Sequence, residues 1–144
     1  MKDFKKYLYL PAPPEEVYLA LTNEATVILW TGADAKVDAQ PDGEFSLWED
    51  AIVGRFIELE PGKKIVQEWY FGPQEDASLV TIKLHPDKKG TSMEVRQTNI
   101  PEEAFEDIVE GWEDPYFASL TDFYGDGDRG STGEESEDKG EDFE

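Results

Sequence analysis

The stretch Gln97–Tyr124 (QTNIPEEAFEDIVEGWEDPYFASLTDFY) carries the longest amphipathic pattern in the chain. Large apolar residues recur in it at steps of three and four, which is the spacing of one stripe on an α-helix. They are Phe105, Ile108, Val109, Trp112, Tyr116, Phe117, Leu120 and Phe123. So large and aromatic a stripe must be covered, and we expect a curved antiparallel sheet to cover it.

This predicted helix has a clear start and a conflict in its middle. Asn99 or Ile100 suits the cap, Pro101 suits the first helical position, and the glutamates that follow complement the positive end of the helix dipole. Pro115 lies inside the pattern, where proline clashes with the carbonyl group four residues back, that of Gly111. Because glycine lets the backbone bend, we expect a kink between Gly111 and Pro115 rather than two separate helices.

The rest of the chain predicts one strand, two short helices and then a series of strands. Residues 3–10 alternate as a strand does, and residues 13–21 and 24–30 carry short helical patterns. The later strands are expected at Ala35–Ala39, Glu44–Trp48, Ala51–Glu60, Lys63–Phe71, Ser78–Leu84 and Thr91–Thr98. Tight turns between consecutive strands imply an antiparallel meander.

These elements predict an α+β fold of the helix-grip type. In it, a curved antiparallel sheet of about six strands packs against a long C-terminal helix that lies across it. A chain of 144 residues fits one such domain. We expect residues 1–124 to form the domain. Residues 125–144 are expected to be an acidic, disordered tail, because they lack the apolar content to order themselves.

The charge of the chain argues against two classes of partner. The formal net charge is -21, and an acidic field repels nucleic acid and anionic membrane surfaces. No apolar run approaches the roughly 20 residues of a membrane span. Prolines interrupt the apolar run near the N-terminus, so no signal peptide is visible. We therefore expect a cytoplasmic protein that binds neither nucleic acid nor membrane.

The residues that usually carry catalysis or metal binding are sparse. The chain has no cysteine, which excludes disulfides and thiolate metal sites. Its single histidine, His85, lies beside Pro86 at a strand end without the neighbours of a catalytic triad. Asp126, Asp128 and Glu137 only partly match a calcium loop, because Ser131 stands where that loop needs glycine. We expect no catalytic residue, no metal and no cofactor.

One enzymatic alternative stays open. Glu58 is the most plausible acid–base group. Side chains alternate along a strand, which places Glu58 on the same face as the apolar residues Ile52 and Phe56. General acid–base work needs such a carboxylate in a water-poor cleft.

Aromatic residues are spread over nearly every predicted element. Most of them are expected in the core, but a sheet wrapped around a helix can also leave a pocket lined by such side chains. The candidate ligand-binding residues are Trp30, Phe45, Phe56, Trp69, Phe71, Met93, Trp112 and Phe117.

Three separated segments resemble one known family. They are residues 11–32 (PAPPEEVYLALTNEATVILWTG), 43–71 (GEFSLWEDAIVGRFIELEPGKKIVQEWYF) and 97–125 (QTNIPEEAFEDIVEGWEDPYFASLTDFYG). In this order they are similar to the opening, central and closing motifs of the C-terminal domain of the activator of Hsp90 ATPase. This domain belongs to the START-like, birch-pollen-allergen-like superfamily. Pro115 and the acidic tail depart from the family pattern.

The resemblance implies the helix-grip fold and two functions. The leading hypothesis is a non-enzymatic protein that binds an Hsp90-type chaperone and stimulates its ATPase. The alternative is a carrier or sensor of a small hydrophobic ligand or lipid, held between the C-terminal helix and the sheet.

Overall fold

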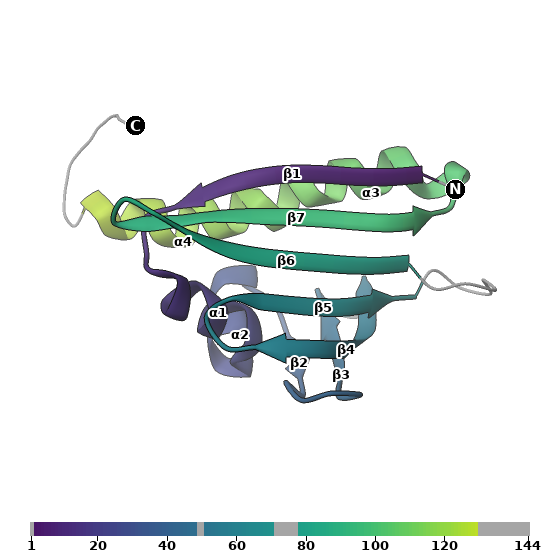
Figure 1. The fold of residues 1–144 in the computed structure, drawn as a ribbon, viewed down its shortest axis with the longest axis horizontal. Coiled ribbons are helices and arrows are strands. Elements are labelled where there is room, and N and C mark those ends of the chain that lie inside the picture. Colours follow the sequence, from purple (N-terminus) through teal and green to yellow (C-terminus); the bar gives the residue numbers. More distant parts are fainter. Residues whose placement is uncertain (1, 49–50, 71–77, 130–144) are drawn as a thin grey trace.

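The computed structural model describes residues 2–48, 51–70 and 78–129, with side chains described as far as Tyr124. Seven strands form one antiparallel sheet in the order β1-β7-β6-β5-β4-β3-β2 (Figure 1). The strands are β1 Lys2–Leu10, β2 Lys36–Val37, β3 Glu44–Leu47, β4 Ile52–Glu60, β5 Lys64–Trp69, β6 Ser78–Asp87 and β7 Gly90–Ile100. Two short helices, α1 (Pro14–Thr22) and α2 (Glu24–Thr31), connect β1 to β2.

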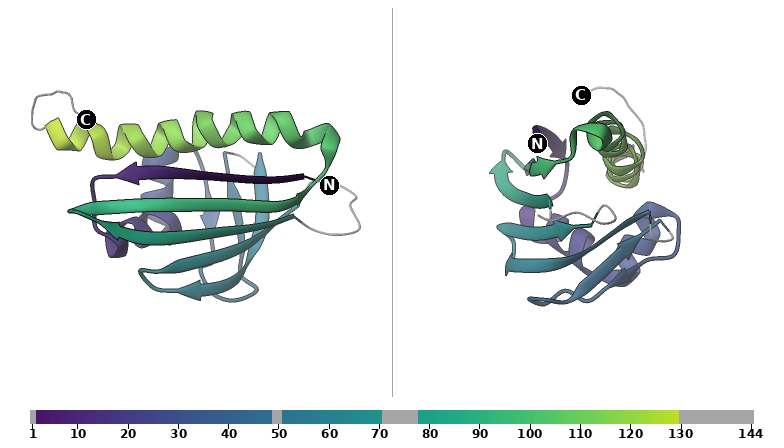
Figure 2. Two further views of the ribbon diagram at one scale, coloured as in Figure 1. Left: turned by 45° about the horizontal axis from the view of Figure 1, so that its top comes forward. Right: turned by 90° about the vertical axis from the view of Figure 1, so that its right-hand side faces the viewer.

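A long helical segment closes the fold after β7. It consists of a 3-10 turn (Glu102–Ala104), α3 (Phe105–Gly111), a π-helical turn (Trp112–Phe117) and α4 (Ala118–Arg129). Figure 2 shows it running along the open side of the bent sheet. The predicted α+β helix-grip fold is confirmed. The six strands expected after the short helices are present, and β1 joins them as the seventh, beside β7.

The end of α4 bears on the predicted domain boundary. The helix continues past Tyr124 to Arg129, and residues 130–144 lie outside the described part of the chain. The division at residue 124 therefore stays a prediction. None of the helices in the described ranges has the length and apolar content needed to cross a membrane.

The closing segment is interrupted where the sequence predicts it. Asp114 has a non-helical backbone (φ -151°, ψ 114°), immediately before Pro115, so two helical halves meet there. Figure 2 shows the halves following one another along the sheet. The second half is packed down, because Tyr116, Phe117 and Leu120 are buried. In contrast, α3 has no buried residue, and its apolar side chains are only half-buried.

The concave face of the sheet is apolar because alternate residues of its central strands point towards the helix. Ile65, Ile82 and Val95 lie opposite one another on β5, β6 and β7, and all three are fully buried. Met93 and Leu84 form the next pair along the same face. This face covers the helical stripe, as the periodicity of both elements predicts.

Trp112 anchors the helical segment to the sheet. Its indole is 1% exposed and stacks on Trp69 of β5, with ring centroids 4.9 Å apart and an interplanar angle of 18°. Its Nε1 donates a hydrogen bond to Gln97 Oε1 (2.7 Å), and Gln97 Nε2 donates to Ser78 Oγ (3.0 Å). Ser78 Oγ donates in turn to the Thr98 carbonyl (2.7 Å). A buried polar chain satisfied in this way fixes one position of the helix.

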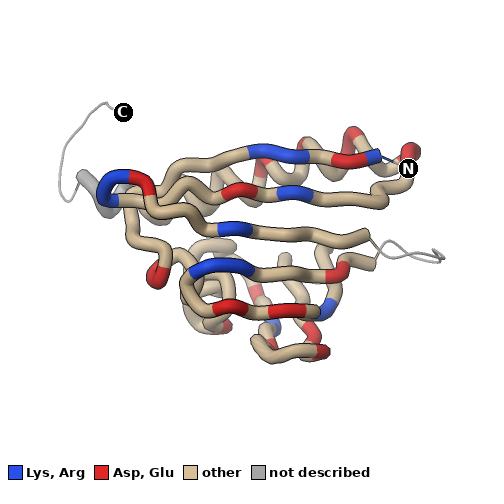
Figure 3. The backbone as a smooth tube through the Cα atoms, in the orientation of Figure 1, with Lys and Arg blue, Asp and Glu red and all other residues tan. Residues whose placement is uncertain are grey.

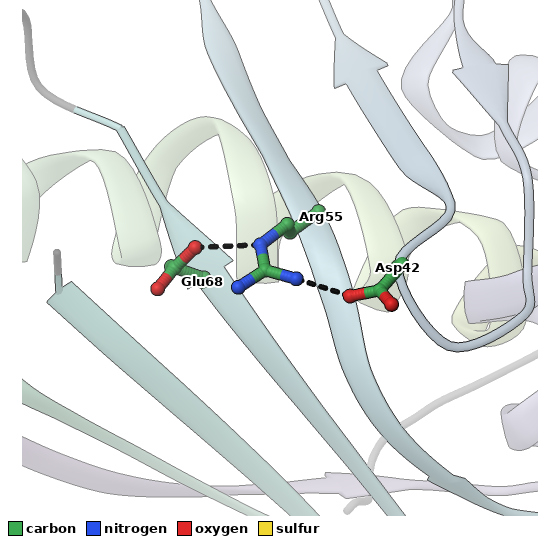
Figure 4. A network of polar contacts seen from close by, with 3 residues as sticks. All are labelled: Asp42, Arg55 and Glu68. Carbon is green, nitrogen blue, oxygen red and sulfur yellow. Dashed lines mark hydrogen bonds and ion pairs between the residues drawn. The ribbon is translucent and has the colours of Figure 1, made fainter.

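A second set of polar side chains connects β4 with β5 and with the turn before β3 (Figure 4). Arg55 on β4 donates from Nε to Glu68 Oε1 on β5 (2.8 Å) and also pairs with Asp42 in the turn before β3. The hydrogen bond with Glu68 is the main cause that raises the pKa of Arg55. Because the group is partly exposed, we assign it the alignment of these strands rather than a large share of stability.

Gly54 is required by the close approach of three strands. It lies opposite Phe45 on β3 and Trp69 on β5. A Cβ atom at this position would lie 2.0 Å from the Glu68 carbonyl oxygen and 2.9 Å from Cζ of Phe45. Any larger residue must therefore move the backbone of a neighbouring strand.

Gly54→Ala should lower the free energy of unfolding by about 1–3 kcal/mol, as overpacking of a core does. Gly111→Ala is the matched control. Gly111 has helical backbone angles (φ -63°), and a Cβ atom there meets nothing within 4 Å. The control should raise the free energy of unfolding by about 0.5–1 kcal/mol. Urea denaturation followed by circular dichroism measures both, and equal effects of the two substitutions would contradict the close approach at Gly54.

Gln97→Leu should lower the free energy of unfolding by about 1–3 kcal/mol, because it leaves the buried Trp112 N–H without an acceptor. Trp112→Phe and the double variant complete a mutant cycle in the same urea assay. The cycle should show that most of the Gln97 effect disappears once the indole N–H is absent. Additive effects of the two substitutions would refute the anchoring role of this hydrogen bond.

Candidate functional site

A groove of about 360 Å3 lies between the first half of the helical segment and the sheet. Its main walls are Trp48, Ile52, Trp69, Ile108, Trp112 and Tyr116. The groove exists because α3 does not bury its apolar side chains against the strands below it. Its volume falls at the lower end of the roughly 300–1,000 Å3 of small-molecule sites.

Aromatic contacts hold the walls of the groove in place. The Trp112 ring centroid lies 4.4 Å from that of Tyr116, and Trp48 meets Tyr116 edge-on at 5.9 Å. Trp30 packs behind them, 5.2 Å from Tyr116. Such contacts add to the stabilisation that burial gives. The walls are therefore largely preformed.

The four tryptophans have already used their hydrogen-bond donors. The indole N–H of Trp30 donates to the Ala20 carbonyl (2.7 Å), and that of Trp48 donates to the Thr31 carbonyl (3.2 Å). The indole N–H of Trp69 donates to Gln67 Oε1 (2.9 Å), and that of Trp112 donates to Gln97 Oε1 (2.7 Å). Trp48, Trp69 and Trp112, which line the groove, thus offer it their ring surfaces rather than their donors. The groove favours an apolar occupant.

The hydroxyl of Tyr116 is the exception. Its side chain is only 2% exposed, and the hydroxyl has no hydrogen-bond partner within the described ranges. Burial raises the pKa of this hydroxyl well above its ordinary value, so it remains a protonated donor at neutral pH. A buried donor without an acceptor is costly. An occupant of the groove that carries one acceptor could relieve this cost.

The structure separates the predicted site residues. Trp69 and Trp112 line the groove. Five others lie in the core: Trp30, Phe45, Phe56, Met93 and Phe117. Phe71 lies outside the described residues.

Sequence reasoning missed Trp48, Ile52, Ile108 and Tyr116 as groove residues. Ile108 and Tyr116 belong to the helical stripe, so the pattern marked them as apolar without distinguishing groove from core. Ile52 lies on a strand with apolar residues on both faces, and parity therefore could not assign it.

The enzymatic alternative at Glu58 is not supported by its position. A register shift between Phe56 and Glu58 turns Glu58 away from the apolar face that strand parity assigned to it. Its side chain is 48% exposed and pairs with Lys64 at 3.1 Å. Lys64 also pairs with Glu60, and hydrogen bonds with Glu58 and Lys64 lower the pKa of Glu60.

His85 also lies away from the groove. Its Nε2 is 2.8 Å from Glu94 Oε1 on the exposed side of β6 and β7. This hydrogen bond is the main cause that lowers the pKa of Glu94. Within the described residues, no group of three or more His, Cys, Asp or Glu side chains could hold a metal ion.

A second hollow, of about 950 Å3, lies beside β2, β3 and β4. Carboxylates contribute much of its lining, including Glu24, Asp38, Asp42 and Glu44. Three of these already accept hydrogen bonds: Glu24 from the backbone N–H of Val37, Asp38 from Gln40 Nε2, and Asp42 from Arg55. The hollow is wider and more polar than the groove, which makes it the weaker candidate.

Comparison with known proteins places these features in a family. Residues 11–125 match the family described as "Activator of Hsp90 ATPase homolog 1-like protein". The human protein named "Activator of 90 kDa heat shock protein ATPase homolog 1" is 34% identical over 120 residues, which is 81% of this chain. The Dictyostelium discoideum protein named "Activator of 90 kDa heat shock protein ATPase homolog" is 35% identical over 102 residues, which is 69% of this chain.

Solved structures agree with the sequence comparison. The crystal structure of an Hsp90 activator from Plasmodium falciparum superposes with a TM-score of 0.80 and 26% identity. The match covers 87% of this chain and 97% of that one. The chain spans only 35% of the human protein and 27% of the Dictyostelium protein. By sequence and by fold, the chain belongs to the "Activator of Hsp90 ATPase homolog 1-like protein" family.

Proposed function

We propose that this protein binds an Hsp90-type chaperone and stimulates its ATPase without being an enzyme itself. The observation that carries the proposal is the 34% identity to the human activator over 81% of the chain. The likeness to the Plasmodium falciparum Hsp90 activator supports it, because that match extends over nearly the whole of the other chain. We expect this activity in the cytoplasm, with neither nucleic acid nor a membrane as partner.

The geometry of the candidate residues favours a regulator. Glu58 and His85 are exposed and paired with neighbouring charges, far from the conditions of general acid–base catalysis. The groove offers ring surfaces and one phenol. Such a surface suits binding, because a few buried aromatic anchors usually supply most of the affinity of an interface.

A pull-down and an ATPase assay with the host's Hsp90 homologue test the proposal. The protein should bind the chaperone and raise its turnover in proportion to the bound fraction. An unrelated acidic protein of similar size and charge is the control, because a net charge of -21 alone could attract basic surfaces. Absence of binding together with an unchanged ATPase turnover of the chaperone would refute the proposal.

A second candidate function is the binding of a small hydrophobic ligand or lipid. The groove supports it, since the walls are apolar and the Tyr116 hydroxyl lacks a partner within the described ranges. A fitting ligand would have an apolar body and one hydrogen-bond acceptor. The sequence relatives do not favour this candidate over the chaperone.

Native mass spectrometry of protein purified from its own host tests the ligand. Tyr116→Phe should reduce retention of a bound molecule by roughly tenfold, the worth of one hydrogen bond. The same substitution should leave stability at neutral pH unchanged or slightly higher, since it removes an unsatisfied donor. Protein that is consistently empty, with no thermal shift from a lipid panel, argues against this function.

A further inference from the structure

The helical segment has a one-sided charge. Residues 102–129 contain ten Asp and Glu residues and a single basic residue, Arg129, at the end of α4. Figure 3 shows acidic residues along α3, while lysines lie on the neighbouring β1. Among the described side chains of this segment, Glu113 alone forms an ion pair, with Lys6 at 2.7 Å. The acids without an ion pair are Glu102, Glu103, Glu106, Asp107, Glu110, Asp114 and Asp122.

Part of this unpaired charge lies at the groove. Asp107 is itself a lining residue, between Ala104 and Ile108. Glu110 stands three residues after Asp107 and so shares its side of α3, and Glu103 lies in the 3-10 turn just before α3. The site is therefore an apolar groove with an acidic rim. Interfaces have the same plan, with an apolar centre and a polar border.

We infer that the groove is the docking site for a protein segment with one large apolar side chain flanked by lysine or arginine. The inference rests on the proposed function and identifies the chemistry of the partner's contact. The apolar side chain fills the groove against Trp48 and Trp112, where burial gives most of the affinity. The basic flanks meet the carboxylates of α3 and accelerate the encounter.

The charge of the site selects this occupant over the others. Nucleic acid and anionic lipid surfaces are repelled by a rim of unpaired carboxylates. A second copy of the chain also carries a net charge of -21, so its approach to this rim is unfavourable. A basic segment is attracted, and its apolar residue finds walls that are already in place.

Gly111 allows the groove to be filled without damage to the fold. It lines the groove, its backbone is helical, and a Cβ atom there meets nothing within 4 Å. Gly111→Leu therefore places an aliphatic side chain in the space of the partner's anchor. Gly111→Ala is the matched control, because it makes the same change in helix propensity and leaves most of the groove open.

A second set of variants tests the rim. E103Q/D107N/E110Q removes three charges beside the groove. E15Q/E16Q/D87N removes three charges of the same kinds from α1 and from the β6–β7 hairpin, neither of which lines the groove. The two variants have equal net charge. A difference between them reports the position of the charges rather than their number.

The experiment measures association and dissociation of the full chain with the purified host Hsp90 homologue, at low and at high ionic strength. Gly111→Leu should weaken affinity by roughly tenfold or more, as the loss of an interface anchor does, with Gly111→Ala close to the unaltered protein. E103Q/D107N/E110Q should slow association several-fold at low ionic strength and reduce its salt dependence. E15Q/E16Q/D87N should change neither quantity. Thermal unfolding confirms that all four variants are folded.

The outcomes separate this inference from the proposed function. If the unaltered protein binds the chaperone and neither Gly111→Leu nor E103Q/D107N/E110Q differs from its control, the docking site is refuted and the proposed function stands. If Gly111→Leu weakens binding but the rim variant does not, the basic flanks are refuted. If the unaltered protein does not bind, the proposed function fails and the inference fails with it.

Discussion

The arrangement of helix and sheet depends on the indole of Trp112. Its ring stacks on Trp69, and its N–H donates a hydrogen bond to the side chain of Gln97. Gln97 is fully buried and in turn donates a hydrogen bond to Ser78. The ring contact alone would let the helix slide along an apolar surface, since hydrophobic burial has no direction. The hydrogen bond is directional, and its loss would leave a buried donor unsatisfied. Together they fix both the distance and the position of the helical segment.

The groove is a consequence of where this anchor lies. Trp112 holds the segment at the junction of its two halves, and Tyr116, Phe117 and Leu120 bury the second half. The first half has no comparable anchor, so space remains between it and the sheet. Membership of the Hsp90 activator family and the presence of an aromatic groove are therefore compatible, because one helix serves both the fold and the proposed contact.

Periodicity was sufficient to predict the fold but not the site. The steps of three and four in the closing stretch and the alternation in strands such as β6 determine which faces meet, and Pro115 located the interruption. The site depends on events that periodicity does not contain. One register shift beside Phe56 reverses the face of Glu58. Half-burial of α3 decides that Ile108 lines a groove while Phe117 lies in the core.

The non-helical residue Asp114 divides the closing segment into two units of unequal local stability. The unit that begins at Tyr116 is tied to the core and can open only when the sheet loses its cover. The α3 unit has no buried residue, and elements with few buried contacts open locally at low free-energy cost. Opening of α3 leaves the Trp112 anchor closed, so the groove can widen while the fold stays intact. The protein thus keeps its adaptable wall and its structural wall on the same helical segment, joined by the turn that contains Trp112 and Asp114.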